Sequence, residues 1–113
     1  MIKGEMRLLY RTPEGKEQVT ILSEGSTIFT PAGVPHSPRF PPDAFVFVTE
    51  RLRREGEIDR FQGYCPSCDD LLHEENFVVS DYTLDPVSKA YENFFESEAF
   101  RTCGKCGTVT PRP

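Results

Sequence analysis

The feature that most constrains this chain of 113 residues is its four cysteines, which form the pattern C-x2-C-x34-C-x2-C. Cys65 pairs with Cys68, and Cys103 pairs with Cys106. Brought together, two such pairs place four thiolates at the corners of a tetrahedron, which suits zinc or a single iron ion. Protein then fills every coordination position, so the metal is expected to be structural and not catalytic. Two disulfides or four free thiols are the alternatives, and the lack of a recognisable export signal disfavours disulfides.

The net charge of the chain limits the classes of molecule that it is expected to bind. There are 13 Lys and Arg against 18 Asp and Glu, which gives a formal net charge of −5. Nucleic-acid binding depends on a basic footprint, so an acidic chain is not expected to bind nucleic acid. No apolar run approaches the length that a bilayer requires, and we expect no membrane association and a cytoplasmic location.

The first half of the chain has the pattern of short β-strands. Alternating apolar and β-branched residues are separated by turn signals such as TPEG and SEGS, a rhythm typical of a β-sandwich or barrel. Four strands are expected, over residues 6–10, 17–22, 27–29 and 44–50.

The second half has a different character, and no strand is expected in it. Apolar residues recur at helical spacing over residues 86–100, behind Asp85 as a cap and Pro86 in the first turn. One cysteine pair precedes this helix and one follows it. We therefore expect two parts: a β-barrel part over residues 1–58, and a C-terminal segment over residues 59–113 with the helix and the metal site.

A spaced motif surrounds one of the two histidines. From Gly25 the residues read G-x5-P-x-G-x2-H, ending at His36. This pattern resembles the second conserved motif of the cupin barrels, in which the glycines make tight turns and the histidine binds a metal inside the barrel. The resemblance implies a mainly β fold of the cupin type (a double-stranded β-helix) with His36 as a metal ligand. A lone histidine is otherwise more often an ordinary core or surface residue.

Three further stretches narrow the resemblance. VPHSPRF is followed by FVFVTERLRR, then by GYC with the first cysteine pair, and finally by FFESEAFRTCGKCGTVTP. Their order resembles the bacterial form of 3-hydroxyanthranilate 3,4-dioxygenase over essentially the whole chain. That family cleaves 3-hydroxyanthranilate with O2 and Fe(II) to 2-amino-3-carboxymuconate semialdehyde, which closes to quinolinate in tryptophan catabolism. Its C-terminal four-cysteine site is rubredoxin-like.

The resemblance also assigns roles to residues. His36 matches an iron ligand, Arg39 matches an arginine that holds the substrate carboxylate, and Glu50 matches a carboxylate that contacts the ring substituents as a proton acceptor. The arginine of the family usually lies one residue further from the histidine, which implies a deletion between His36 and Arg39. Without the resemblance, Arg39 and Glu50 would be read as solvated surface charges.

The family pattern predicts that two iron ligands are missing. In the family a histidine and a glutamate precede a Gly-x-Met that matches Gly4 to Met6, so both are expected to fall before Met1. His73, the only other histidine, matches a position that does not bind the catalytic iron. The barrel is therefore expected to be incomplete at its N-terminus and the chain inactive alone, whether it is a fragment, has a mis-assigned start or is a natural truncation.

Several functions stay open. The alternative to the dioxygenase is a non-catalytic, metal-stabilised cupin-like fragment or interaction module. A zinc-ribbon nucleic-acid binder is a third reading, suggested by the cysteines and disfavoured by the charge. Related aminophenols remain alternative substrates, and unpaired strand edges in an incomplete barrel leave a homodimer open.

Overall fold

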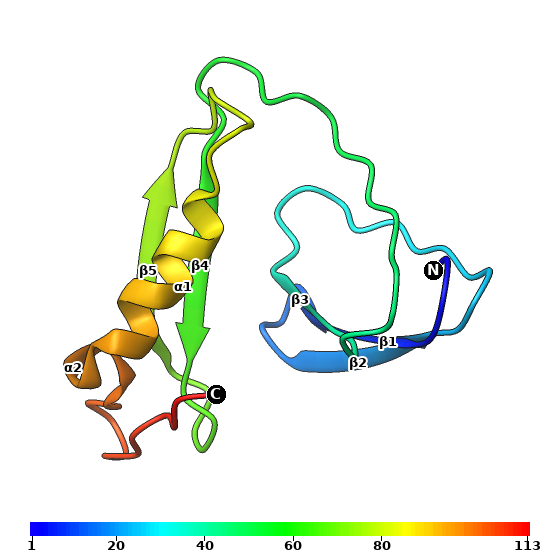
Figure 1. The fold of residues 1–113 in the computed structure, drawn as a ribbon. Coiled ribbons are helices and arrows are strands. Elements are labelled where there is room, and N and C mark those ends of the chain that lie inside the picture. Colours follow the sequence, from blue (N-terminus) through cyan, green and yellow to red (C-terminus); the bar gives the residue numbers. More distant parts are fainter. The chain divides into compact units, whose positions relative to one another are not determined.

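The computed structural model describes all residues, 1–113, and divides the chain into two compact units, Met1–Glu50 and Arg51–Pro113 (Figure 1). Each unit contains its own sheet, and the two are described separately below. No helix in either unit has the length and apolarity that a membrane crossing requires.

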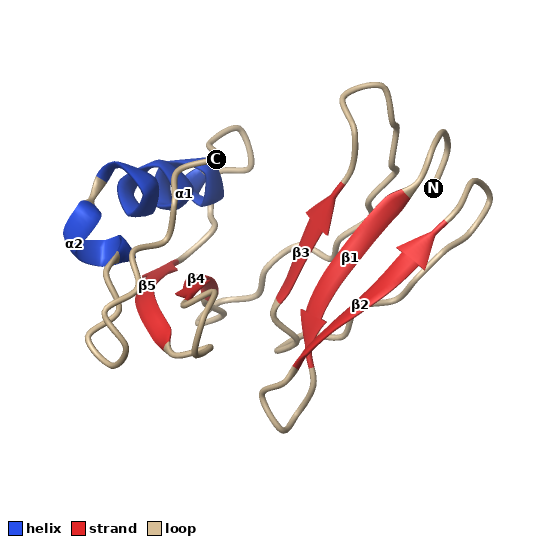
Figure 2. Ribbon diagram, turned by 90° about the horizontal axis from the view of Figure 1, so that it is seen from below, coloured by secondary structure: helices blue, strands red, loops and turns tan.

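The first unit is built on a three-stranded antiparallel sheet of order β2-β1-β3 (Figure 2). Its strands are β1 (Met6–Arg11), β2 (Glu17–Leu22) and β3 (His36–Arg39). The expected hairpin between the first two strands is confirmed. Gly15 adopts a φ of 79° in its turn, a conformation that glycine reaches without steric cost, and its N–H donates to the carbonyl of Thr12 at 2.8 Å.

One face of this sheet forms a small core. Met6, Leu8 and Leu22 are buried, with exposed fractions of 3–5%, and Met1 and Val46 pack against them. Alternate residues of a strand point to opposite faces, so these side chains share one face of β1 and β2. The sheet does not close into a barrel.

Two expected strands are absent, and one unexpected strand is present. Residues 27–29 have no strand, and of residues 44–50 only Phe45 makes a β-bridge, with Lys3. A strand exists only where a neighbour accepts and donates its backbone hydrogen bonds, and the apolar pattern alone does not supply that neighbour. Phe29 and Phe47 are accordingly exposed, by 84% and 73%. In contrast, β3 forms despite Pro38, because it lies at the edge of the sheet, where proline is tolerated.

The second unit combines a β-hairpin with helices, and the expectation that this part has no strands is wrong. Its elements are β4 (Asp59–Tyr64), β5 (Leu71–Phe77), α1 (Pro86–Glu96) and α2 (Glu98–Arg101). The two strand sequences, DRFQGY and LLHEENF, contain few apolar residues. The alternation of apolar and polar residues is therefore too weak to predict strands there.

Helix α1 begins where the sequence predicts and ends earlier. The Asp85 carboxylate accepts a hydrogen bond from the Ser88 N–H at 3.0 Å, and Pro86 occupies the first turn. Ser97 interrupts the predicted helix: its N–H donates to the Phe94 carbonyl, and its hydroxyl caps α2 by accepting from the Phe100 N–H at 3.2 Å.

Aromatic packing joins α1 to the hairpin. Phe94 is 2% exposed, and its ring lies 5.9 Å from that of Phe61 on β4. A Cβ at Gly63 would come within 2.9 Å of the Phe94 ring, so this strand position has room only for glycine. The fold is thus mainly β with a C-terminal helix, as expected, and the hairpin and helix together position the cysteines.

Candidate functional site

The four cysteines converge in the second unit. Cys65 and Cys68 lie in the turn between β4 and β5, and Cys103 and Cys106 follow α2. Their sulfur atoms all lie within 4.8 Å of one another, with 3.6 Å between Cys65 and Cys106 and 3.5 Å between Cys68 and Cys103. Both of these contacts join one C-x2-C segment to the other.

Each C-x2-C segment forms a knuckle, and the two knuckles repeat the same hydrogen bonds. In the first, Cys65 donates its N–H to the Asp70 carbonyl at 2.8 Å and accepts from the Asp69 N–H at 3.0 Å. In the second, Cys103 donates its N–H to the Thr108 carbonyl at 2.8 Å and accepts from the Gly107 N–H at 2.9 Å. The two segments thus share the same backbone turn around their first cysteine.

The knuckles differ in the residue that follows the second cysteine. The shared turn requires a positive φ there, which Gly107 supplies at 78° and Asp69 at 66°. Asp69 is the only non-glycine residue of the chain with positive φ. Aspartate tolerates this region better than most residues, but glycine occupies it at lower cost.

The four cysteine residues also differ in exposure. Cys65 and Cys103 are buried, Cys68 is half-buried and Cys106 is exposed. Hydrogen bonds from the hydroxyl and then the backbone N–H of Thr108 lower the pKa of the Cys106 thiol to about 6. Cys106 is therefore the thiol of the cluster that we expect to ionise readily near neutral pH.

The cysteine geometry fits a tetrahedral metal ion. With metal–sulfur bonds of about 2.3 Å, the sulfur atoms of a tetrahedron are roughly 3.8 Å apart. The Cys65–Cys106 and Cys68–Cys103 sulfur distances lie near this value and far above the roughly 2.05 Å of a disulfide. All four cysteines are free thiols in the structure, and together they could hold one metal ion.

His36 begins strand β3 in the first unit. Its ring is exposed, and its Nδ1 lies 2.9 Å from the Val34 carbonyl. Since the carbonyl can only accept, Nδ1 carries the proton in this contact, which leaves the Nε2 lone pair able to bind a metal. His36 pairs with Tyr10, and the alternation of the strand puts it on the same sheet face as Leu8.

The structure does not bring Arg39 to the face of His36. Arg39 pairs with Arg7, on the opposite side of the sheet, and its guanidinium donates to the Ser37 hydroxyl. Glu50 lies outside the strands, at the end of the first unit. Apart from the four cysteines, no group of three metal-binding side chains gathers anywhere in the chain. The roles expected for His36, Arg39 and Glu50 stay predictions.

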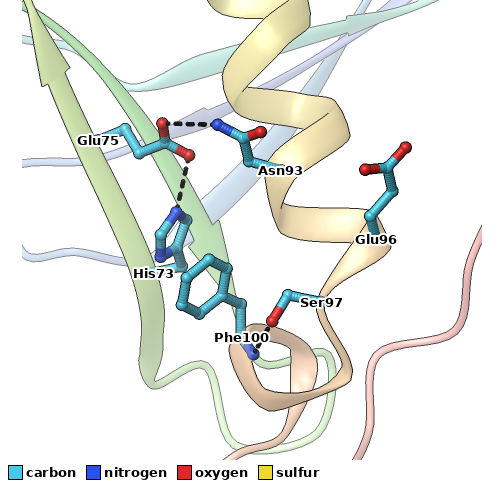
Figure 3. A pocket seen from close by; sticks show the side chains of 6 residues that line it. All are labelled: His73, Glu75, Asn93, Glu96, Ser97 and Phe100. Carbon is cyan, nitrogen blue, oxygen red and sulfur yellow. Dashed lines mark hydrogen bonds and ion pairs between the residues drawn. The ribbon is translucent and has the colours of Figure 1, made fainter.

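The second unit also contains an open pocket of about 480 Å³ between β5 and the helices (Figure 3). The Glu75 carboxylate joins its two sides, because it accepts from Asn93 at 3.2 Å and lies 2.8 Å from the His73 Nε2. The His73 ring stacks on Phe100 with 4.0 Å between the ring centroids. The Glu75 carboxylate is thus engaged by Asn93 and His73, and it connects α1 to the hairpin. The stacked rings of His73 and Phe100 connect α2 to the same strand.

Sequence reasoning missed two residues of the cysteine site. The hydroxyls of Ser67 in the first knuckle and Thr108 beyond the second lie 3.0 Å apart. Serine and threonine are too common in loops for their types to be a signal. The only signal available was their place within two residues of a cysteine.

Comparison with known proteins agrees with these features. The profile of the family described as 3-HAO: 3-hydroxyanthranilic acid dioxygenase matches residues 1–95. The 3-hydroxyanthranilate 3,4-dioxygenase of Bacillus cereus (strain ATCC 10987 / NRS 248) is 34% identical over 110 residues, which cover 97% of this chain and 61% of that protein. The protein of the same name from Shewanella woodyi is 36% identical over 111 residues, covering 97% and 58%.

A fungal relative extends the comparison. The 3-hydroxyanthranilate 3,4-dioxygenase of Podospora anserina is 39% identical over 89 residues, which cover 79% of this chain and 48% of that protein. The chain thus spans between about half and three fifths of the length of the curated relatives described here. Since the family profile covers most of the sequence and the resemblance holds for bacterial and fungal relatives, this chain belongs to the 3-hydroxyanthranilic acid dioxygenase family.

Proposed function

We propose that this chain forms part of an Fe(II)-dependent, ring-cleaving dioxygenase that converts 3-hydroxyanthranilate and O2 to 2-amino-3-carboxymuconate semialdehyde. The main support is the match of relatives with that enzyme name to 97% of the chain. These relatives are longer, and we propose that the activity also requires residues of the kind found in their unmatched part, so that the 113 residues do not turn over substrate by themselves.

His36 is the proposed catalytic-iron ligand within the chain. Its Nδ1 is engaged with the Val34 carbonyl at 2.9 Å, and this contact fixes the ring and leaves Nε2 as the binding atom. Bound Fe(II) would supply open coordination positions for the substrate and O2. A facial iron site takes two histidines and one carboxylate, so His36 needs two further ligands.

Arg39 and Glu50 are proposed to act on the substrate. A guanidinium offers a planar fork that matches a carboxylate, which suits Arg39 to holding the substrate's carboxyl group. Glu50 is proposed as the acceptor of a proton from the ring substituents. The four cysteines are proposed to hold a structural zinc or iron ion, which has no open position for substrate.

The test of this function compares the chain with an extended form. The extended form adds to the chain the residues of the Bacillus cereus relative that the chain does not match. Both are loaded with Fe(II) and supplied with 3-hydroxyanthranilate while O2 uptake and ring opening are followed. We expect turnover in the extended form only. Iron-dependent ring opening by the 113 residues alone would contradict the need for further ligands. An inert extended form that binds iron in addition to any metal held by the four cysteines would contradict the dioxygenase assignment.

Variants of the extended form test the three residues. His36→Ala is expected to abolish turnover together with binding of the catalytic iron, and to leave any metal at the four cysteines in place. Arg39→Ala is expected to raise KM more than it lowers kcat, and Glu50→Ala to lower kcat more than it raises KM. The Arg39→Ala variant is the most informative of the three, because Arg39 and His36 lie on opposite faces of β3 and a shared substrate site requires both. An unchanged KM in Arg39→Ala would remove this residue from the substrate site.

A non-catalytic, metal-stabilised module is the second candidate function. The observation that favours it is that the chain assembles one group of potential metal ligands, the four cysteines, and none around His36. This module would bind one structural metal ion per chain and would not respond to 3-hydroxyanthranilate, even in the extended form.

A further inference from the structure

We propose that Thr108, held in place by Ser67, is a positioning residue for the metal centre: its hydroxyl donates a hydrogen bond to the metal-bound Cys106 sulfur and thereby strengthens the most exposed ligand. The inference rests on the proposed binding of a metal ion by the four cysteines. It concerns residues of this chain that the cysteine pattern itself does not include.

The first support is a continuous chain of three polar atoms. The Cys106 sulfur lies 3.2 Å from the Thr108 hydroxyl oxygen, which lies 3.0 Å from the Ser67 hydroxyl oxygen. In the thiol form, Cys106 donates to Thr108 and Thr108 donates to Ser67. A metal-bound thiolate has no proton to donate, so the direction must reverse: Ser67 donates to Thr108, and Thr108 donates to the sulfur.

The second support is the difference between the knuckles. Asp70 occupies the position in the first knuckle that Thr108 occupies in the second, as their matching backbone bonds to Cys65 and Cys103 show. An ionised carboxylate cannot donate a hydrogen bond, so the Asp70 side chain has no equivalent role at Cys68. The hydroxyl donor of this position is therefore found beside Cys106, which is the most exposed of the four cysteines.

The third support is the connection between distant segments. Ser67 and Thr108 are separated by 41 positions, and their hydrogen bond joins the first knuckle to the second. A hydroxyl on an isolated loop rotates freely, whereas the bond from Ser67 directs the Thr108 proton toward the sulfur. Hydrogen bonds to a ligand sulfur stabilise its negative charge and, with iron bound, raise the reduction potential.

The experiment measures metal binding in Thr108→Val, Thr108→Ser and Ser67→Ala. Zinc affinity is determined by competition with a chromophoric chelator, and the reduction potential is determined for the iron-loaded protein. The matched control is Thr110→Val, because the buried Thr110 hydroxyl has no hydrogen-bond partner. We expect Thr108→Val to lower the zinc affinity about tenfold, the lower end of the effect of such supporting residues.

The reduction potential should fall in the same variant, since the sulfur loses a donor. Thr108→Ser should restore both values because it keeps the hydroxyl, Ser67→Ala should shift both in the direction of Thr108→Val, and Thr110→Val should match the wild type. Wild-type affinity and potential in Thr108→Val would overturn the inference. So would equal losses in Thr108→Val and Thr108→Ser, which would indicate packing. A wild-type chain that binds neither zinc nor iron would overturn the metal centre itself.

Discussion

At the scale of single residues, Asp69 has a conformation that its side chain does not favour. Its φ of 66° lies in the left-handed region, where a Cβ costs about 1 kcal/mol relative to glycine. The corresponding position of the second knuckle is Gly107, with a φ of 78°. The comparison shows that the turn, and not the residue type, dictates the conformation.

Replacing Asp69 with glycine is therefore expected to stabilise the protein. Asp69→Gly should raise the free energy of unfolding of the metal-loaded chain by about 0.5 kcal/mol, because relief of the strain is partly offset by the greater freedom of glycine in the unfolded state. The opposite change, Gly107→Ala, should lower it by about 1 kcal/mol. Urea denaturation followed by circular dichroism measures both, and a destabilised Asp69→Gly would indicate that the Asp69 side chain contributes more than its backbone costs.

Gly63 is limited by space and not by backbone conformation. A Cβ at this position would lie 2.9 Å from Cζ of the buried Phe94 ring. Gly63→Ala should lower the free energy of unfolding by about 1–3 kcal/mol, the usual effect of overpacking. Gly104→Ala is the control, since nothing lies within 4 Å of its Cβ position, and it should change stability by less than about 0.5 kcal/mol.

A second substitution separates overpacking from other causes. Phe94→Leu creates space beside residue 63, so the double variant Gly63→Ala/Phe94→Leu should lose less stability than the sum of the two single variants. Strictly additive losses would mean that the methyl group and the ring do not meet.

At the scale of elements, the Glu75 carboxylate connects strand β5 to helix α1. The carboxylate receives hydrogen bonds from His73 on its own strand and from Asn93 on α1. The bond from His73 and then that from Asn93 lower the pKa of the Glu75 carboxyl below its usual value. Folding therefore favours the ionised form, and the linkage adds stability above the unfolded-state pKa that is lost as the pH falls through the folded-state pKa.

The expected consequence is a pH-dependent effect of Glu75→Gln. This variant should have a lower urea midpoint than the wild type at pH 6. The difference should shrink as the pH falls below the ordinary glutamate pKa of about 4.3 and then through the lower pKa of the folded state, where the wild-type carboxyl also becomes protonated. Comparing the two proteins at each pH cancels the loss of metal that acid causes in both. A difference that stays constant from pH 6 to pH 3 would mean that the Glu75 charge does not contribute.

At the scale of the whole molecule, each unit has a core of only a few side chains. Met6, Leu8, Leu22 and Ala44 are the buried apolar residues of the first unit, and Cys65, Ala90, Phe94 and Cys103 are those of the second. Units of this size bury too little apolar surface to be robust without further support. In the second unit, two of the four buried side chains are cysteines, so a bound metal would supply much of that support.

Metal removal should therefore affect the two units differently. Chelation, or the substitution Cys103→Ser, is expected to expose the amides of β4, β5 and α1 to hydrogen exchange, because a metal held by the four cysteines would join the hairpin to the segment after α2. Protection of β1 and β2 should change little, since all four cysteines lie in the second unit. Mass spectrometry of exchanged peptides measures both, and equal loss in the two units would show that they unfold together.

Much of this organisation could be predicted from local sequence. The hairpin of β1 and β2 follows from alternating residues on either side of a Pro-Gly turn, and the start of α1 follows from Asp85 and Pro86. Each of these signals is contained in a short stretch of chain. The strands expected over residues 27–29 and 44–50 do not form, because a strand also requires a neighbouring strand to exchange hydrogen bonds with. The presence of that neighbour cannot be read from the short stretch itself.

The sequence by itself determined the family and the four-cysteine group, because both are carried by residue types at defined spacing. Only the tertiary structure decided that His36 and Arg39 lie on opposite faces of β3, since that depends on the register of the strand with β1. It alone also placed the Ser67 hydroxyl against Thr108, across 41 positions of the chain. The physical reason is the same in both cases: spacing along the chain restricts local conformation, whereas contacts between distant segments depend on how whole elements pack.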